Sequence, residues 1–245
     1  MATIKGHKLN RLYGHIARGA PLSSEDLALL GISPDLTGYY VRAGWLQRIA
    51  RGVYCRPNDP LALHPSITLL QRRLAGLHIS GKSALAWQGM GDQVALPPIL
   101  HLRGWQAGHL PDWFTERFPA EYHRNRLFEE QPDGQLHVQP FENRNGAPLI
   151  SKPERALLEV LSEVGLRQSL REARELVQRS DGLRGDVLLD LLKRCASVKT
   201  VRLCLQLGRE FQRAWLKELE PSLLPKGSDR AWVWRSADGL LVLKP

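Results

Sequence analysis

The 245-residue sequence predicts an α+β fold, with a small N-terminal domain over residues 1–60 and a larger mixed α/β domain over residues 61–245. Three observations support this prediction. Capped helical segments and a short basic hairpin occupy the first 56 residues. A stretch rich in proline and polar residues, Pro57–Pro60, then interrupts regular structure. After residue 150 the apolar residues recur at helical spacing, so we expect this part to be rich in helices.

The N-terminal segment begins with two helical patterns. One apolar face recurs at positions i, i+3, i+4 and i+7, in Leu9, Leu12, Tyr13 and Ile16. After Pro21 breaks the chain, Ser23 can cap a second helix, and Asp26 three positions later completes a capping box. We therefore expect two helices before residue 31, the second of them buried through Leu27 and Leu30.

A turn, a third helix and a hairpin follow. Gly31 suits the turn between helices, and Ser33 with Pro34 begins a helix that Gly44 ends. The expected buried stripe of this helix consists of Leu36, Tyr40 and Ala43. Two short strands, expected over Trp45–Ile49 and Val53–Arg56, flank a turn at Gly52. This order of elements is a winged helix-turn-helix, which presents one helix to the DNA major groove and a loop to the backbone.

The third helix and the wing supply the predicted DNA contacts. We expect Ser33–Gly44 to enter the major groove, with residues off the buried stripe nearest the base edges and arginines on the wing at phosphates. The candidate DNA-binding residues are Lys8, Arg11, Ser33, Thr37, Gly38, Arg42, Arg48 and Arg51. The alternative is a solvated basic face on an ordinary helical subdomain.

Charge is concentrated in the same segment. Residues 1–56 hold eight Lys and Arg against three Asp and Glu, a net charge of +5. The other residues contribute +4 of the total of +9, so more than half the excess lies in under a quarter of the chain. A concentrated positive field favours nucleic-acid binding, because each neutralised phosphate releases a counterion.

Four segments resemble the AbiEi-type antitoxins of type IV toxin–antitoxin systems. They are GISPDLTGYYVRAGWLQRIARGVYCRP (Gly31–Pro57), HISGKSALAWQGM (His78–Met90), SKPERALLEVLSEV (Ser151–Val164) and CASVKTVRLCLQLGREFQRAWLKEL (Cys195–Leu219). They keep their order along most of the chain, whereas residues 97–150 match less clearly.

The resemblance implies an N-terminal winged helix that represses its own operon and a C-terminal domain that confers antitoxicity. It also implies operator DNA as a partner, with inverted repeats upstream of the operon, and a neighbouring nucleotidyltransferase toxin. Whether antitoxin and toxin touch stays open, and so does the alternative of a module that sequesters the toxin directly.

Beyond residue 60 we expect a helix followed by strands and then mainly helices. Capping boxes are expected at Ser151 with Glu154 and at Ser169 with Glu172. The other expected elements are a helix over His64–Ala75, strands near Ile99–Leu102 and Leu136–Pro140, helices over Val187–Arg194 and Val198–Leu219, and a terminal hairpin turning at Asp238-Gly239.

One motif resembles a phosphate-binding loop. The residues from Gly76 to Ser83 fit G-x-x-x-x-G-K-S, which raises the alternative of a nucleotide-dependent enzyme. A true phosphate loop follows a buried strand, whereas the residues before this one form an amphipathic helical pattern with Arg72 and Arg73 exposed. We therefore expect no nucleotide site here and no enzyme activity.

Other catalytic and targeting signals are weak. The eight histidines are scattered without metal-ligand spacing, so we expect neither a metal nor another cofactor. Three cysteines, Cys55, Cys195 and Cys204, cannot all pair, and the last two are expected to be small buried residues. Without an apolar run long enough to cross a bilayer, or a signal-peptide pattern, we expect a cytoplasmic protein with no membrane contact.

Overall fold

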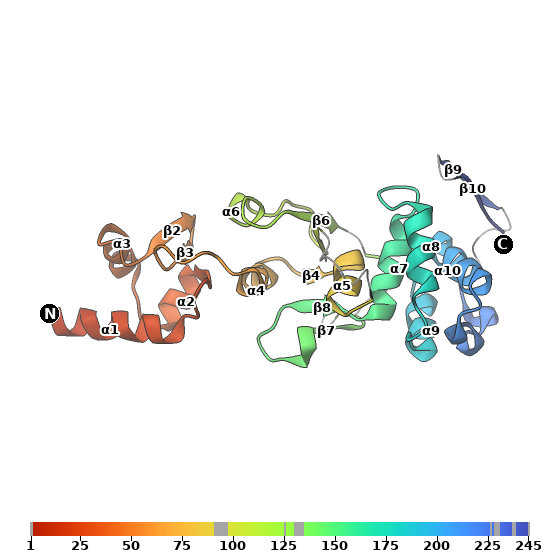
Figure 1. Ribbon diagram of the computed structural model, residues 1–245. Coiled ribbons are helices and arrows are strands. Elements are labelled where there is room, and N and C mark those ends of the chain that lie inside the picture. The colour runs from red at the N-terminus through yellow and green to blue at the C-terminus, as the bar shows by residue number, and fades with distance from the viewer. Residues whose placement is uncertain are drawn as a thin grey trace.

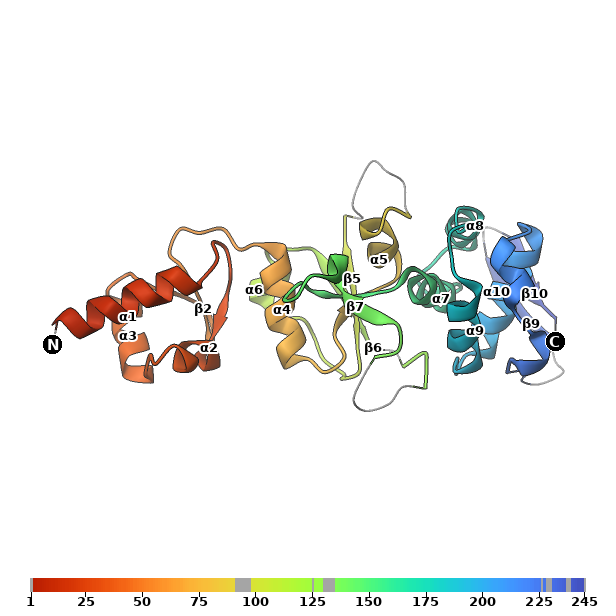
Figure 2. The same cartoon turned by 90° about the horizontal axis from the view of Figure 1, so that it is seen from below.

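The computed structural model describes residues 2–90, 98–124, 126–129, 135–225, 227, 231–236 and 239–244. Helices and several sheets confirm the α+β fold class. Figures 1 and 2 show an elongated molecule, with the N-terminal elements at one end, a mixed sheet in the middle and the last helices at the other end.

The N-terminal elements form a winged helix-turn-helix. In order they are α1 (Ala2–His15), β1 (Leu22–Ser23), α2 (Ser24–Leu29), α3 (Pro34–Arg42), β2 (Gln47–Ala50) and β3 (Val53–Cys55). The three strands pair antiparallel in the order β1-β3-β2. Side chains from all three helices meet in one hydrophobic cluster, which includes Leu12, Leu27 and Tyr40.

Local signals in this segment act as predicted. The Ser23 hydroxyl accepts a hydrogen bond from the Asp26 amide at 3.1 Å, and the Asp26 carboxylate accepts one from the Ser23 amide at 2.8 Å, which completes the capping box. Gly31, Gly44 and Gly52 all adopt positive φ, the left-handed conformation that their turns require.

A mixed sheet forms the middle of the molecule. Its elements are α4 (Leu63–Arg73), β4 (His78–Ile79), α5 (Gly81–Trp87), β5 (Leu100–Gly104), α6 (Asp112–Thr115), β6 (Ala120–Arg124), β7 (Val138–Pro140), the 3₁₀ turn η1 (Phe141–Asn143) and β8 (Leu149–Ser151). The strand order is β6-β5-β4-β8-β7, with β5–β6 and β4–β8 parallel.

The C-terminal part is helical, as predicted. It contains α7 (Pro153–Glu163), α8 (Leu170–Gln178), α9 (Gly185–Lys193), α10 (Val198–Glu210), the 3₁₀ helices η2 (Ala214–Glu218) and η3 (Pro221–Leu223), and the hairpin β9 (Trp232–Ser236) and β10 (Gly239–Leu243). The predicted turn residues Ala237 and Asp238 lie outside the described residues.

Helix α7 joins the middle and C-terminal parts. Leu157 and Leu161 pack into the C-terminal cluster, whereas Ala156 and Val160 pack into the cluster of the mixed sheet. Every residue from 154 to 162 is buried. Because the helix is buried on all sides, its charged residues need partners inside the protein.

Two predicted features in this region are wrong. Ser151 ends strand β8 instead of capping α7, and the Glu154 carboxylate accepts a hydrogen bond from the Arg184 amide at 3.0 Å. The single helix expected over Val198–Leu219 ends at Glu210. The chain turns back there because Trp215 is buried against Gly208, where a Cβ would lie 2.6 Å from the indole ring.

Candidate nucleic-acid interface

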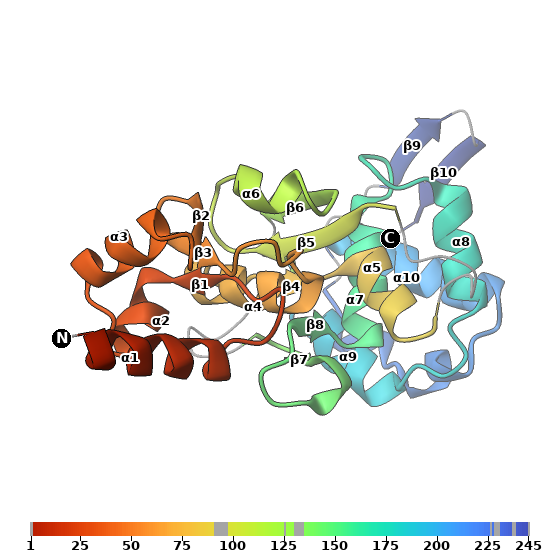
Figure 3. The same ribbon diagram turned by 60° about the vertical axis from the view of Figure 1, so that its left-hand side comes forward.

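Helix α3 has the position of a recognition helix. The turn at Gly31 sets it across α2, and the Ser33 hydroxyl caps it by accepting a hydrogen bond from the Leu36 amide at 3.3 Å. Tyr40, which is fully buried, anchors the helix on the N-terminal core. Figures 1 and 3 show α3 beside the β2–β3 hairpin, at the end of the molecule that carries α1.

The buried face of α3 differs from the predicted one. Thr37 is only 5% exposed, and its hydroxyl donates a hydrogen bond to the Ser33 carbonyl at 3.0 Å. Ala43 is exposed, because the helix ends at Arg42. The expectation that Thr37 is free to meet DNA is therefore wrong: it lies three positions before Tyr40 and shares its face of the helix.

The outer face of α3 carries an acid, an aromatic ring and a cation. Asp35, Tyr39 and Arg42 recur at helical spacing and are all exposed, and Gly38 beside them is half-buried. Tyr39 is 38% exposed, and its ring contacts Trp45 edge-on, with centroids 5.9 Å apart. Sequence reasoning missed Tyr39, although its spacing of three residues from Arg42 already placed the two on one face.

Two predicted phosphate-binding residues on α1 have different surroundings. The Lys8 ammonium group donates a hydrogen bond to the Gly31 carbonyl at 2.7 Å, so that it holds the turn before α3. Arg11 is exposed. Lys8 therefore supports the helix-turn-helix through a contact that the sequence did not indicate.

The wing gains one cation from outside the predicted domain. Arg48 and Arg51 are exposed on the β2–β3 hairpin, as predicted, and Arg48 Nε donates to the Ala50 carbonyl at 3.3 Å. From α4, Arg73 Nη2 donates to the Gly52 carbonyl at 3.0 Å, which places a further guanidinium at the tip of the wing. No local pattern in the sequence connected α4 with the wing.

An ion pair beside the wing ties α4 to α2. Arg72 contacts both carboxylate oxygens of Asp26, at 2.6 and 3.1 Å. Burial alone would raise the pKa of Asp26, but the hydrogen bonds from Arg72 and Ser23 hold this pKa below its usual value. The carboxylate therefore stays ionised, and it orients the wing side of α4 as well as capping α2.

One cation of the N-terminal segment serves the fold. Arg56 donates to the backbone carbonyls of Tyr13 and Ile16, the second at 2.6 Å, and lies over the Tyr13 ring. These carbonyls end α1, where a positive charge is favoured by the helix dipole. Arg56 is half-buried and its charge is directed into the protein.

The phosphate-loop resemblance has no phosphate-binding geometry. Helix α4 precedes it, and the strand inside it, His78–Ile79, is only two residues long. The Gly81 amide donates to the buried Glu159 carboxylate at 3.0 Å, and Lys82 pairs with Glu172 at 3.2 Å. The Glu159 carboxylate therefore occupies the place where a phosphate oxygen would bind. Its negative charge would repel a phosphate.

Within the parts of the chain that the structure describes, no helix is both long and apolar enough to cross a membrane.

Comparison with known proteins identifies the family. Residues 5–96 match the family "Transcriptional regulator, AbiEi antitoxin N-terminal domain", and residues 98–244 match "Transcriptional regulator, AbiEi antitoxin, Type IV TA system". No curated protein matches the sequence significantly. The crystal structure of the RV2827C protein from Mycobacterium tuberculosis is similar in fold, with a TM-score of 0.51 and 18% identity over 87% of this chain and 83% of that one. The chain belongs to the AbiEi antitoxin family of transcriptional regulators from type IV toxin–antitoxin systems.

Proposed function

We propose that this protein is an autorepressor that binds operator DNA upstream of its own operon, in the cytoplasm. Residues 1–60 would read the DNA, and residues 61–245 would confer antitoxicity without acting as an enzyme. The observation that carries the proposal is the joint exposure of Arg42 on the outer face of α3 and of Arg48 and Arg51 on the adjoining wing. These are the two surfaces with which winged helices contact a duplex.

The residues divide into base readers and phosphate binders. Arg42, with Tyr39 and Gly38 beside it, faces the base edges when α3 lies in the major groove. Arg11, Arg48, Arg51 and Arg73 bind phosphates. Ser33 acts as the helix cap and sets the entry angle of α3. Thr37 and Lys8 support this surface from inside the domain.

A salt titration tests the DNA-binding part of the proposal. Four phosphate contacts predict a slope of roughly −4 per protomer for log K against log salt, with each lost contact reducing it by about 0.9. Fluorescence anisotropy with a labelled duplex from the protein's own upstream region measures this slope. Arg51→Ala should weaken binding to all duplexes and reduce the slope by about one, whereas Arg42→Ala should reduce the preference for the operator.

Arg171→Ala is the matched control for these variants. Arg171 is an arginine on α8 whose side chain is 83% exposed, so its loss changes the total charge equally without touching α3 or the wing. Equal affinity for operator and random duplexes at physiological salt would overturn the proposal. If Arg51→Ala and Arg171→Ala change the slope of log K against log salt by the same amount, the wing does not take part in the interface.

We further propose that the protein counters a nucleotidyltransferase toxin. Family membership supports an antitoxin role. The separate hydrophobic cluster of the N-terminal domain supports the assignment of DNA binding and antitoxicity to different domains. Co-expression with the product of the neighbouring gene tests it. The double variant Arg42→Ala, Arg51→Ala should lose repression and keep antitoxicity. Loss of both activities, or a stable complex with the toxin through the N-terminal domain, would favour direct sequestration instead.

A further inference from the structure

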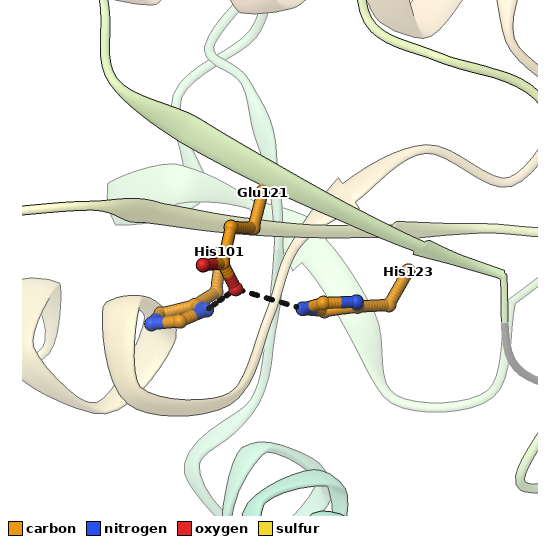
Figure 4. A group of neighbouring side chains, drawn as sticks. All are labelled: His101, Glu121 and His123. Atoms are coloured by element: carbon orange, nitrogen blue, oxygen red, sulfur yellow. Dashed lines mark ion pairs between the residues drawn. The ribbon is translucent and has the colours of Figure 1, made fainter. Parts of the chain in front are cut away.

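Two histidines and a glutamate meet at a cavity of about 310 Å³ in the mixed sheet. His101 lies on β5, and Glu121 and His123 lie on β6 (Figure 4). The cavity is remote in the sequence from the winged helix-turn-helix, and the proposed DNA-binding function does not use it. These histidines are scattered along the sequence, and their proximity depends on the pairing of two strands.

Strand register explains why the three side chains converge. β5 and β6 are parallel, with His101 opposite Glu121 and Arg103 opposite His123. Residues i and i+2 of a strand point to the same face, so Glu121 and His123 lie on one side of the sheet. His101, opposite Glu121, lies on that side as well. Figure 4 shows the Glu121 carboxylate between the two imidazole rings.

The spacing of the ligand atoms suits a small metal ion. Glu121 Oε2 lies 3.8 Å from His101 Nδ1 and 3.3 Å from His123 Nε2, and one ligand atom from each residue lies within 4.8 Å of the others. Two ligands about 2.1 Å from a tetrahedral ion are roughly 3.4 Å apart. The His123 contact already fits this spacing, whereas the His101 contact is longer, so metal binding requires the His101 ring to move toward both other ligands.

The charges around the cavity are compatible with a cation. Each of the three basic side chains that line it has a carboxylate partner: Lys82 pairs with Glu172, and both Arg103 and Arg167 pair with Glu163. Glu159, the remaining acid, is held by His78 and Arg155. Among the described residues, Glu121 forms ion pairs with the two histidines and with no Lys or Arg.

We propose that His101, Glu121 and His123 bind a divalent transition-metal ion, with Zn²⁺ as the first choice. Two imidazoles and one carboxylate form a ligand set that zinc takes in proteins, and three protein ligands leave a fourth position for water or another donor. All three residues line the cavity, so this open position is accessible from it. The chemistry of the ligands distinguishes the site from one for Mg²⁺ or Ca²⁺, which prefer oxygen ligands.

Metal binding to the tag-free, full-length protein tests the proposal. After treatment with EDTA and dialysis, Zn²⁺ is titrated by calorimetry, and the metal retained after desalting is measured by mass spectrometry. We expect one Zn²⁺ per chain with a Kd in or below the micromolar range. His123→Gln and Glu121→Gln should each weaken binding by at least about 10-fold. His109→Gln, which changes an exposed histidine outside the cluster, is the matched control and should leave binding unchanged.

A cobalt titration keeps the test independent of how the variants fold. Co²⁺ should give visible absorption bands in the unsubstituted protein, with large contact shifts on the ring protons of two histidines among the eight. The proposal would be overturned if the protein, after exposure to a large molar excess of Zn²⁺ and desalting, retained much less than one Zn²⁺ per chain. Binding that the folded Glu121→Gln variant retains in full, or contact shifts on histidines other than His101 and His123, would overturn it as well.

Discussion

Replacing Glu159 with glutamine should strongly destabilise the middle and C-terminal parts of the protein. The Glu159 side chain lies on the central helix α7 and is completely buried. Its Oε1 accepts hydrogen bonds from His78 Nε2 at 3.0 Å and Arg155 Nε at 2.9 Å. Its Oε2 accepts hydrogen bonds from the Gly81 amide at 3.0 Å and the Ser151 hydroxyl at 2.9 Å. One carboxylate thus connects α5, α7 and two strands.

The size of the effect follows from these contacts. Glutamine keeps the volume of the side chain but removes the charge that balances Arg155, which is itself buried. The glutamine amide nitrogen donates hydrogen bonds and cannot accept them. It therefore replaces one carboxylate oxygen, which accepts hydrogen bonds, with a group that faces other donors. Breaking a buried ion pair by removing one partner costs about 3–5 kcal/mol. We expect the free energy of unfolding to fall by that amount.

Urea unfolding followed by far-UV circular dichroism and tryptophan fluorescence measures this change. Glu175→Gln is the matched control, because Glu175 pairs with Arg171 at 3.2 Å on the surface of α8, where the two side chains are 46% and 83% exposed. It should cost no more than about 0.5 kcal/mol. A loss below about 1 kcal/mol in Glu159→Gln would contradict the prediction and show that the buried network contributes little to stability.

Three further predictions follow from burial. Burial alone would raise the pKa of Glu159, but His78 and Arg155 hold it well below the usual value of 4.5. Its stabilising effect is therefore complete above about pH 4.5 and is lost as the pH falls below it, so an acid titration of the unfolding midpoint should be shallower in Glu159→Gln than in the unsubstituted protein. Burial raises the pKa of the Cys195 thiol to about 11 and that of Cys204 to about 12. Mass spectrometry should find both unmodified by iodoacetamide at pH 8 until urea unfolds the protein; rapid labelling of the folded chain would contradict this. Thr37→Val should leave the preference for operator over random duplexes unchanged in the anisotropy assay, because the Thr37 side chain is buried, and a changed preference would return it to the interface.

Local signals in the sequence were sufficient to predict the winged helix-turn-helix. The caps at Ser23 and Ser33 and the turns at Gly31 and Gly52 depend on hydrogen bonds and backbone conformations within a few residues. The same holds for the cap at Ser169 and for the terminal strands. Such features can be recognised before any tertiary contact is known, because the interacting groups are neighbours in the chain.

Other features arise only when distant segments pack together. Thr37 is buried by the N-terminal core, and Arg73 reaches the wing from a helix outside that domain. The Gly81 amide donates its hydrogen bond to a carboxylate from α7, so this carboxylate takes the place of a phosphate in a motif that matches a phosphate loop by its letters. His101, Glu121 and His123 meet because two parallel strands pair in one register. The sequence alone thus determined the local elements and the family. The surroundings of each side chain depended on long-range packing, because the spacing of residues along the chain does not encode which distant segments meet.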